Sequence, residues 1–265
     1  MPPTKDFASI ADASQPNAGR IYDFLLGGNH NFEVDRQAAQ GILQLIPVLP
    51  KLARLIRWFL GEAVRRLSNE GFQHFIDFAS GLPTVDHVHQ IAPPGSKIIY
   101  SDVDPVTVAY GQEIVKDNPN VRYVVCNVEN PIGLLESQDV KDLFGSERKV
   151  AIGFNGIAYF LPDEKMAHSL EVLYQWAAPG SKLFMTDAHI PTMGKQAQEI
   201  GQIYAKMNQP YYARVLDTIK KLVGPWKVAA PGFLELEEWV EMSPTAGAEL
   251  KSTFGSSMVG CILSK

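Results

Sequence analysis

Two hydrophobic patterns alternate through the middle of the chain. Short apolar runs predict buried β-strands, and each strand is followed by a stretch with apolar residues at helical spacing. Strands are predicted at residues 75–78, 97–101, 121–126, 150–154 and 182–186. Helices are predicted at residues 84–91, 105–118 and 163–177. Strands that alternate with helices predict a mostly parallel sheet with helices on both faces.

Both ends of the chain depart from this alternation. Three helices are predicted before the first strand, at residues 18–26, 33–46 and 50–71. After residue 190 come two helical stretches, the second beginning at Pro210, and then an antiparallel strand pair at residues 226–230 and 257–263. The chain is therefore predicted to form one domain over residues 1–265, with a helical N-terminal cap (16–71), an α/β core (72–190 and 225–265) and a helical insertion (191–224).

Composition limits the classes of partner. The chain has 265 residues, 46% of them hydrophobic, which is enough for one domain with a large core. A formal net charge of −5 argues against nucleic acid as a partner. Cys126 and Cys261 lie in apolar runs and are predicted to be buried thiols. No apolar run reaches the length of a membrane span and no signal peptide is recognised, so we expect a cytoplasmic protein without membrane contact.

The stretch from His74 to Thr84 carries the first candidate site. Asp77 lies near the end of the strand predicted at 75–78, a tight turn follows, and Thr84 is the predicted N-cap of the next helix. This strand, turn and helix would direct backbone N–H groups and a positive helix end at a ligand. Asp102 ends the next predicted strand, roughly twenty residues after Gly81, where an acid accepts hydrogen bonds from ribose hydroxyls.

The turn distinguishes between two nucleotide ligands. The dinucleotide pattern G-x-G-x-x-G would place glycine at Ala79, Gly81 and Thr84, and two of these three glycines are missing. The pattern D-x-G-x-G of S-adenosylmethionine (SAM) enzymes fits better, with Ala79 in place of its first glycine. A plain turn with a buried acid is the alternative for the loop alone. Asp102 favours SAM.

A longer resemblance supports this interpretation. Residues 16–32, PNAGRIYDFLLGGNHNF, resemble the N-terminal signature of a bacterial SAM-dependent methyltransferase family that was formerly a domain of unknown function. The resemblance continues at residues 75–84, 102–105 and 160–163 and covers nearly the whole chain. It implies the Rossmann-like class I methyltransferase fold, a seven-stranded sheet with an antiparallel last hairpin, and SAM as cofactor. It implies no substrate.

The sequence departs from the family pattern at four places. Asn127 stands where the family usually has Asp, and its amide can still bind the adenine edge. Tyr159 replaces a common His, Thr186-Asp187 replaces a common Ser-His, and Ile56 replaces a common Asn. Three of these departures lie at predicted strand ends, where the site should be, so a substrate of the family does not carry over to this chain.

The motifs and the signature together give a set of candidate cofactor-binding residues. Asp102 is placed at the ribose, Asn127 and Val128 flank the adenine, and Asn155-Gly156 lies beside the methionine part or forms a plain turn. The full set is Arg20, Tyr22, Gly28, His30, Asp77, Ala79, Gly81, Thr84, Asp102, Val103, Asn127, Val128, Asn155 and Gly156.

Several candidates have a structural alternative. Asp77 contributes to binding, directly or through its loop, or it bonds backbone N–H groups of that loop. Tyr22 belongs to a lid that closes over SAM or packs in the core. Arg20 pairs with the methionine carboxylate or with Asp23. No metal site is predicted.

The candidate catalytic residues are Tyr159, Asp187 and His189. Asp187 would hold or deprotonate the acceptor and His189 would relay the proton, unless Asp187 caps a turn and His189 is solvated. Tyr211 and Tyr212 would line the acceptor pocket or pack between helices.

The predicted function is methyl transfer from SAM to oxygen or nitrogen of a small-molecule acceptor. The alternatives are a SAM-binding protein without methyl transfer and, third, a nicotinamide oxidoreductase. A homodimer is compatible with the sequence, which leaves the oligomeric state open.

Overall fold

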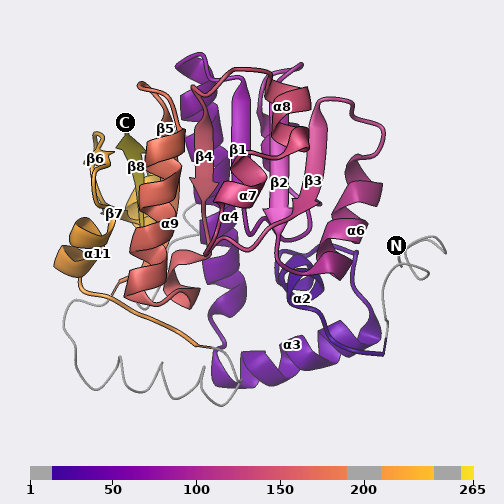
Figure 1. Cartoon of the computed structure of the whole chain (residues 1–265). Coiled ribbons are helices and arrows are strands. Elements are labelled where there is room, and N and C mark those ends of the chain that lie inside the picture. Colours follow the sequence, from indigo (N-terminus) through magenta and orange to yellow (C-terminus); the bar gives the residue numbers. More distant parts are fainter. Residues whose placement is uncertain (1–13, 190–209, 242–257) are drawn as a thin grey trace.

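One mixed β-sheet forms the centre of the protein (Figure 1). The computed structural model describes residues 14–189, 210–241 and 258–265. The strands of this part are β1 (His74–Phe78), β2 (Lys97–Asp102), β3 (Val121–Val125), β4 (Ala151–Phe154), β5 (Lys182–Ala188), β6 (Lys227–Val228), β7 (Leu234–Glu235) and β8 (Met258–Ser264). Their order in the sheet is β3-β2-β1-β4-β5-β8-β6, and β7 also pairs with β8.

The sheet is parallel except at one edge. The five strands from β3 to β5 are parallel, and β8 runs antiparallel to β5 along the full length of both. The short strands β6 and β7 pair antiparallel with opposite ends of β8, so together they fill the seventh place in the sheet. The predicted fold, a mostly parallel sheet with an antiparallel end, is confirmed.

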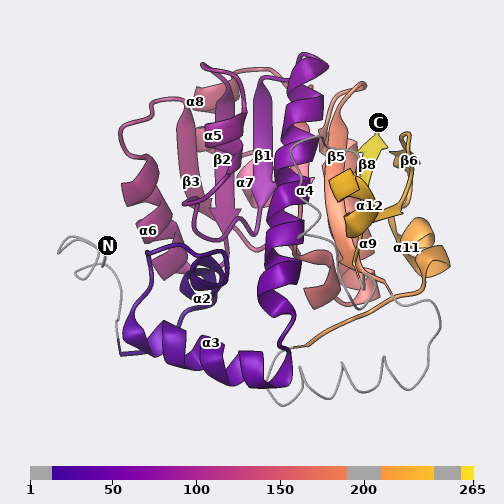
Figure 2. The ribbon, with the colours of Figure 1, turned by 180° about the vertical axis from the view of Figure 1, so that it is seen from behind.

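Helices cover both faces of the sheet. One face carries α4 (Leu49–Asn69), α5 (Val88–Ile91), α6 (Pro105–Val115) and α12 (Leu236–Glu241), as Figure 2 shows. The other face carries α7 (Ile132–Leu135), α8 (Gln138–Phe144), α9 (Asp163–Trp176) and α11 (Leu216–Leu222) (Figure 1). Each layer buries a separate hydrophobic cluster against the strands. The central strands β1, β2, β4, β5 and β8 are buried on both faces, which explains why they are mostly apolar runs.

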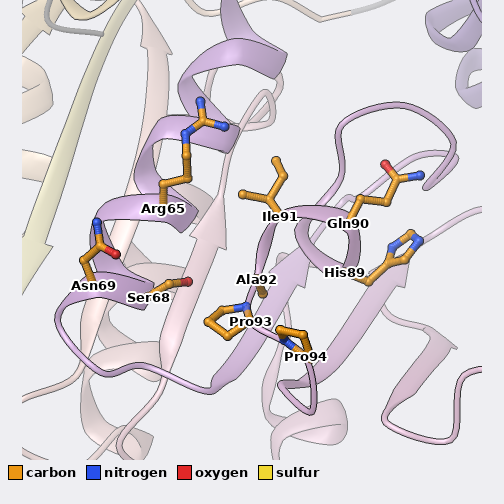
Figure 3. A pocket seen from close by; sticks show the side chains of 9 residues that line it. All are labelled: Arg65, Ser68, Asn69, His89, Gln90, Ile91, Ala92, Pro93 and Pro94. Carbon is orange, nitrogen blue, oxygen red and sulfur yellow. The ribbon is translucent and has the colours of Figure 1, made fainter. Parts of the chain in front are cut away.

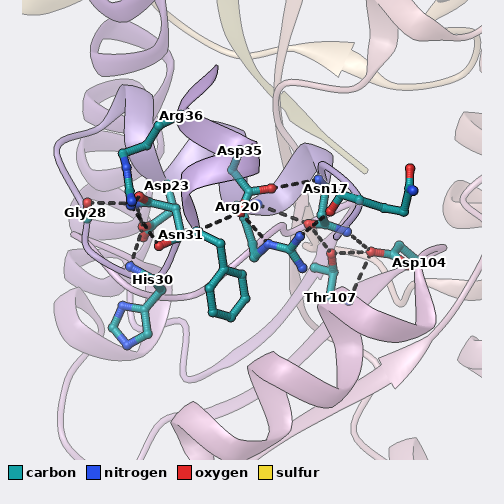
Figure 4. A network of polar contacts seen from close by, with 12 residues as sticks. Asn17, Arg20, Asp23, Gly28, His30, Asn31, Asp35, Arg36, Asp104 and Thr107 are labelled. Carbon is teal, nitrogen blue, oxygen red and sulfur yellow. Dashed lines mark hydrogen bonds and ion pairs between the residues drawn. The ribbon is translucent and has the colours of Figure 1, made fainter. Parts of the chain in front are cut away.

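The N-terminal cap lies across the carboxyl ends of the strands (Figures 1 and 2). The part of the predicted cap (16–71) that lies there, called the cap from here on, is α2 (Ala18–Leu25) and α3 (Glu33–Leu45), whereas α4 packs on one face of the sheet. Asn17 caps α2 by accepting a hydrogen bond from the backbone of Arg20 at 3.1 Å. The Arg20 Nε donates to Asp35 Oδ2 at 2.7 Å, and both side chains are buried. Asp35 also accepts from the backbone N–H groups of Asn17 and Phe32, so one carboxylate joins both helices (Figure 4).

Two predicted helices are shorter than expected. The helix predicted at 84–91 is wrong in its first half, because α5 begins at Val88 and its N-cap is His87 and not Thr84. The helix predicted to begin at Pro210 is also wrong, because backbone N–H groups in residues 210–215 bond to Tyr159 and to β5 before α11 begins. The remainder of the predicted insertion, residues 191–209, lies outside the described residues, and the domain boundaries stay predictions.

Other elements have no counterpart in the sequence prediction. They are the two short helices α7 and α8 between β3 and β4, the strand β7 and the helix α12. All are between two and seven residues long, and so short a segment holds too little periodic pattern to identify its type. None of them changes the order of the main strands.

The buried Arg20–Asp35 pair should be a main source of cap stability. We expect Arg20→Met to lower the free energy of unfolding by roughly 3–5 kcal/mol, because it leaves a buried carboxylate without its counter-charge. The control is Arg65→Met, since Arg65 is nearly half exposed and pairs with Glu62 at 3.6 Å. That change should cost less than about 1 kcal/mol. Urea unfolding would measure the free energy of unfolding of both variants. Equal losses in the two variants would contradict the role of the Arg20–Asp35 pair in cap stability.

Candidate active site

The loop after β1 has an unusual backbone. Ala79 and Gly81 have φ angles of 52° and 61°, in the left-handed region that favours glycine. A side chain at Gly81 would meet no atom within 4 Å, so the backbone and not space requires glycine there. Ala79 adopts the same region as an L-residue, which explains why the D-x-G-x-G pattern has glycine at this place.

This loop brings the two acids of the sequence motif to one edge. The Gly81 N–H donates to Asp102 Oδ2 at 3.1 Å, and the Asp104 N–H donates to Asp102 Oδ1 at 3.1 Å. Asp102 is half-buried at the end of β2, and burial raises its pKa. Val103 follows it with 61% of its side chain exposed. A carboxylate beside an exposed apolar side chain fits a nucleoside, which has polar ribose hydroxyls and an apolar base.

A buried pair lies behind the loop. Asp77 is buried, and desolvation raises its pKa to about 6. The His87 Nε2 lies 3.8 Å from Asp77 Oδ2 and 3.1 Å from the carbonyl oxygen of Ser80. Burial lowers the pKa of His87 well below its ordinary value, and its Nδ1 accepts from the Val88 N–H. Neutral His87 therefore carries its proton on Nε2 and donates to Ser80, which supports the loop.

The turn after β4 is held by a hydroxyl from β5. The Gly156 N–H donates to Thr186 Oγ1 at 2.9 Å, and Thr186 in turn donates to Asn155 Oδ1 at 3.1 Å. The Asn155 side chain also donates to the backbone oxygen of Ile56 in α4 at 3.3 Å. The turn of Asn155 and Gly156 therefore lies at the carboxyl edge of the sheet, and these hydrogen bonds fix its conformation. The Tyr159 side chain is in the same place, with its hydroxyl near Gly156.

Asp187 has a partner that the sequence analysis missed. It is 1% exposed, and both its oxygens lie 3.2 Å from Arg214 Nη1. Burial raises the pKa of Asp187 to about 7, although the charge of Arg214 opposes the rise. Arg214 also donates to Asp163 and to the backbone of Ala158.

Neighbouring residues of β5 face opposite sides of the sheet. Thr186 faces α4, whereas Asp187 is held in its ion pair on the other side. His189 Nδ1 lies 3.2 Å from Glu235 Oε1, so neither side chain is in the setting expected for an acceptor base. The geometry favours a structural role for Asp187, and the catalytic roles of Asp187 and His189 stay untested predictions.

The residues predicted to flank the adenine are arranged differently from each other. Asn127 is exposed, and its side-chain oxygen accepts from the Glu129 N–H at 2.9 Å. The Val128 side chain is buried in the core, so it offers only its backbone to a ligand. Contact of Val128 with the adenine therefore stays a prediction that concerns its backbone, because its side chain packs in the hydrophobic cluster.

Residues of the N-terminal signature connect the cap to Thr84, which follows the loop after β1. The Asp23 carboxylate accepts from the His30 N–H at 2.8 Å, from the Asn31 side chain at 3.1 Å and from the Thr84 hydroxyl. A Cβ on Gly28 would lie 2.2 Å from Asp23 Oδ1, so glycine is required there. The predicted capping role of Thr84 is wrong because α5 begins only at Val88, with His87 as its N-cap.

The cap residues predicted to reach SAM have mainly structural partners. Arg20 pairs with Asp35 and not with Asp23, and its predicted contact with the methionine carboxylate stays a prediction. The Tyr22 hydroxyl donates to the backbone oxygen of Ala53 at 3.2 Å. His30 lies edge-on to Tyr110 with ring centroids 6.4 Å apart. Contact of Tyr22, Gly28 and His30 with SAM stays a prediction.

Arg57 is the residue of this edge that the sequence analysis missed. It is 5% exposed in α4, and its guanidinium lies 5.6 Å from the centroid of the Tyr22 ring. A sequence signal exists, because Arg57 falls in the apolar stripe of α4, four residues after Ala53 and three before Leu60. A charge in such a stripe must be buried or reach a polar partner.

A separate hollow of the described surface lies elsewhere (Figure 3). Its volume is about 550 Å³, and it lies between the last turns of α4 and the short helix α5 with the loop that follows it. This is the amino end of β1 and β2, opposite to the acids and the loop. It is therefore not part of the candidate site. No helix among the described residues is long and apolar enough to cross a membrane.

Comparisons with known proteins agree with this geometry. Residues 4–261 match the model of a family described as S-adenosyl methyltransferase. The chain belongs to the S-adenosyl methyltransferase family. A comparison with curated proteins finds no match.

Solved structures resemble this member of the family over nearly their whole length. A Thermobifida fusca protein assigned as a methyltransferase is 27% identical, with a TM-score of 0.84 over 97% of each chain. A DUF574 family protein from Streptomyces avermitilis is 25% identical, with a TM-score of 0.82 over 96% of this chain and 99% of that one. Magnesium protoporphyrin IX methyltransferase from Synechocystis PCC 6803, at 13% identity and a TM-score of 0.56, shares the fold.

Family membership makes SAM the cofactor, and the residues at the carboxyl edge fit it. Asp102 presents a carboxylate for ribose hydroxyls, Val103 offers an exposed apolar surface beside it, and the turn at Asn155 is polar. No phosphate-binding cluster is required, because SAM is held without one. The individual contacts remain expectations that mutation can test.

Asp102 gives the simplest test of the cofactor position. We expect Asp102→Ala to cost roughly 2–3 kcal/mol of SAM binding free energy, because hydrogen bonds to charged groups are worth about this much. The matched control is Asp139→Ala on α8, which removes an exposed carboxylate. Titration calorimetry would measure both variants. An Asp102→Ala protein that stays folded and binds SAM as tightly as the wild type would contradict the assignment.

Burial of Asp77 predicts a pH effect on stability. Its pKa is raised from the ordinary 3.8 to about 6, so the unfolded chain loses this proton first. The wild type should therefore lose stability relative to Asp77→Asn as the pH rises from about 4 to about 6, and the difference should be constant above that range. Urea unfolding of both proteins across the range measures it. A difference that does not change with pH would exclude the raised pKa.

Proposed function

We propose that this protein transfers the methyl group of SAM to an oxygen or nitrogen atom of a small-molecule acceptor. Bound SAM supplies an electrophilic methyl group on a sulfonium. Displacement at this group depends on in-line positioning and on exclusion of water more than on a strong base. The observation that supports the proposal is an aromatic cluster at the carboxyl end of β4.

This cluster combines rings from two parts of the chain. The Tyr159 ring lies 4.6 Å from the ring of Phe160 and 5.6 Å from that of Tyr211, measured between centroids. The Tyr212 N–H donates to the Tyr159 carbonyl oxygen at 2.8 Å, which fixes the later segment against the turn. Aromatic faces stabilise cations and stack on flat ligands, so this place suits both a sulfonium and an acceptor.

The elements around the edge favour a small acceptor. The cap covers the carboxyl ends of β1 and β2, and residues 210–215 follow the carboxyl end of β5 (Figure 1). An acceptor that binds between the cap and residues 210–215 would have protein on two sides. The formal net charge of −5 offers no support for a polyanionic substrate such as a nucleic acid.

The proposal assigns no residue as a catalytic base. Asp187 is engaged by Arg214 and His189 by Glu235, as described above. An amine or an ionised hydroxyl presents its own lone pair to the methyl group, and an amine releases its proton to water after transfer. The aromatic cluster around Tyr159 then orients the acceptor, and this orientation determines which acceptor is methylated.

Labelled SAM tests the proposal directly. The protein is incubated with deuteromethyl-SAM and either the small-molecule filtrate or the retained macromolecules of a bacterial extract, and products are identified by mass spectrometry. We expect a deuteromethylated product and the demethylated cofactor only with the filtrate. Label found only in macromolecules would contradict a small acceptor. Binding of SAM without consumption in either fraction would favour a SAM-binding protein that transfers no methyl group.

Two variants separate the ring of Tyr159 from its hydroxyl. Once an acceptor is known, Tyr159→Ala should lower kcat at least about tenfold, because loss of positioning affects the transfer step. Tyr159→Phe keeps the ring and should stay within about threefold of the wild type. Equal losses in both variants would assign the effect to the hydroxyl and contradict aromatic positioning.

A further inference from the structure

Arg57 is a buried cation at the carboxyl edge of the sheet. Its helix α4 packs on the face that carries α5 and α6. The backbone oxygen of the preceding residue, Ile56, accepts a hydrogen bond from Asn155 at 3.3 Å, so this turn of α4 touches the end of β4. Its charge also acts on Asp77 at the end of β1 and on Tyr22 of the cap. Arg57 thus lies where the cap, β1 and β4 meet.

The Arg57 guanidinium contacts the Tyr22 ring and hydroxyl, but it lacks the counter-charge that a buried cation requires. Its Nε and Nη1 are buried and have no hydrogen-bond partner among the described residues. In the same part of the chain, no carboxylate comes within the 4.0 Å of an ion pair. An arginine cannot lose its proton to escape this cost, as a lysine or histidine can. A buried, unpaired cation with two open donors marks the position of an anion.

The cofactor offers one anionic group. SAM carries a sulfonium, an amine and an α-carboxylate, and it has no phosphate. Asp102 on β2 is placed at the ribose, and the strand order β2-β1-β4 puts Arg57 on the other side of the loop, beside Asn155. The carboxylate lies at the end of SAM opposite to the adenosine. With the ribose at Asp102, the carboxylate therefore falls on the side of the loop where Arg57 lies.

We propose that Arg57 binds the α-carboxylate of SAM from helix α4. The ion pair fixes the methionine end and therefore the direction in which the methyl group points. Arg57 takes the place that Arg20 had in the sequence prediction, because Arg20 is occupied by Asp35. This proposal rests on SAM as the cofactor of the family and is independent of the acceptor.

A pair of ligands tests this contact without any acceptor. Titration calorimetry compares SAM with decarboxylated SAM, which keeps the sulfonium and the amine and lacks only the carboxylate. The wild type should prefer SAM by at least about tenfold, the scale of a charged hydrogen bond. Arg57→Met should lower the affinity for SAM by a similar factor and leave that for decarboxylated SAM within about threefold. The preference between the two ligands should then disappear.

Two further variants complete the experiment. Arg54→Met removes the same charge from the exposed side of α4, three residues earlier, and should keep the full preference for SAM. Arg57→Lys keeps the charge without the guanidinium fork and should retain part of the preference, and it replaces Arg57→Met if that variant does not fold.

Three results would overturn the proposal. They are a wild type that binds both ligands equally, an Arg57→Met or Arg57→Lys variant with undiminished preference, and an Arg57→Met variant that loses affinity for both ligands by the same factor. A wild type that prefers SAM but methylates no small molecule would instead contradict the proposed acceptor and leave the role of Arg57 standing.

Discussion

The left-handed turn after β1 is the constraint on which the candidate site depends. Two positive φ angles reverse the chain so that the Gly81 N–H reaches Asp102 and the Ser80 N–H reaches Ser101 on β2. The outer atoms of the turn are held as well, since His87 donates to the Ser80 oxygen and Tyr123 donates to the Gly81 oxygen. Neighbouring elements therefore determine the shape of this loop, and Ala79 can adopt a conformation that an isolated alanine would avoid.

Buried carboxylates connect the cap to this turn. Asp23 and Asp35 each accept at least three hydrogen bonds, which compensates for the loss of water around a buried charge. Through Thr84, Asp23 attaches the cap to the chain that follows the turn. The long signature in the N-terminal segment therefore has a structural purpose: it builds two polar centres that hold a cover over the cofactor edge.

The pleat of β5 separates two tasks at the same edge. Thr186 faces α4 and fixes the turn at Asn155, whereas Asp187 faces the other side and binds Arg214. The Arg214 backbone N–H also donates to Ala188, so this ion pair and the adjacent hydrogen bond attach residues 210–215 to the sheet. The face on which a polar residue at this strand end falls thus determines which neighbouring segment it holds.

The hydrophobic pattern determined the five parallel strands, the antiparallel strand at the end of the chain and the helical cap. A strand that is buried on both faces is an apolar run, so a short stretch of sequence is enough to recognise it. The spacing of Asp77, Gly81 and Asp102 likewise indicated a nucleoside site, because strands of one parallel sheet end at the same edge.

Only the tertiary structure decided which polar groups meet. The hydroxyl of Thr84 is taken by Asp23, the carboxylate of Asp187 by Arg214, and the charge of Arg20 by Asp35. In each case the partner in the structure is a residue distant in sequence, which the local pattern does not identify. Periodicity reports which side of an element faces the core, but a buried polar group is satisfied by whichever partner the fold brings within hydrogen-bond distance.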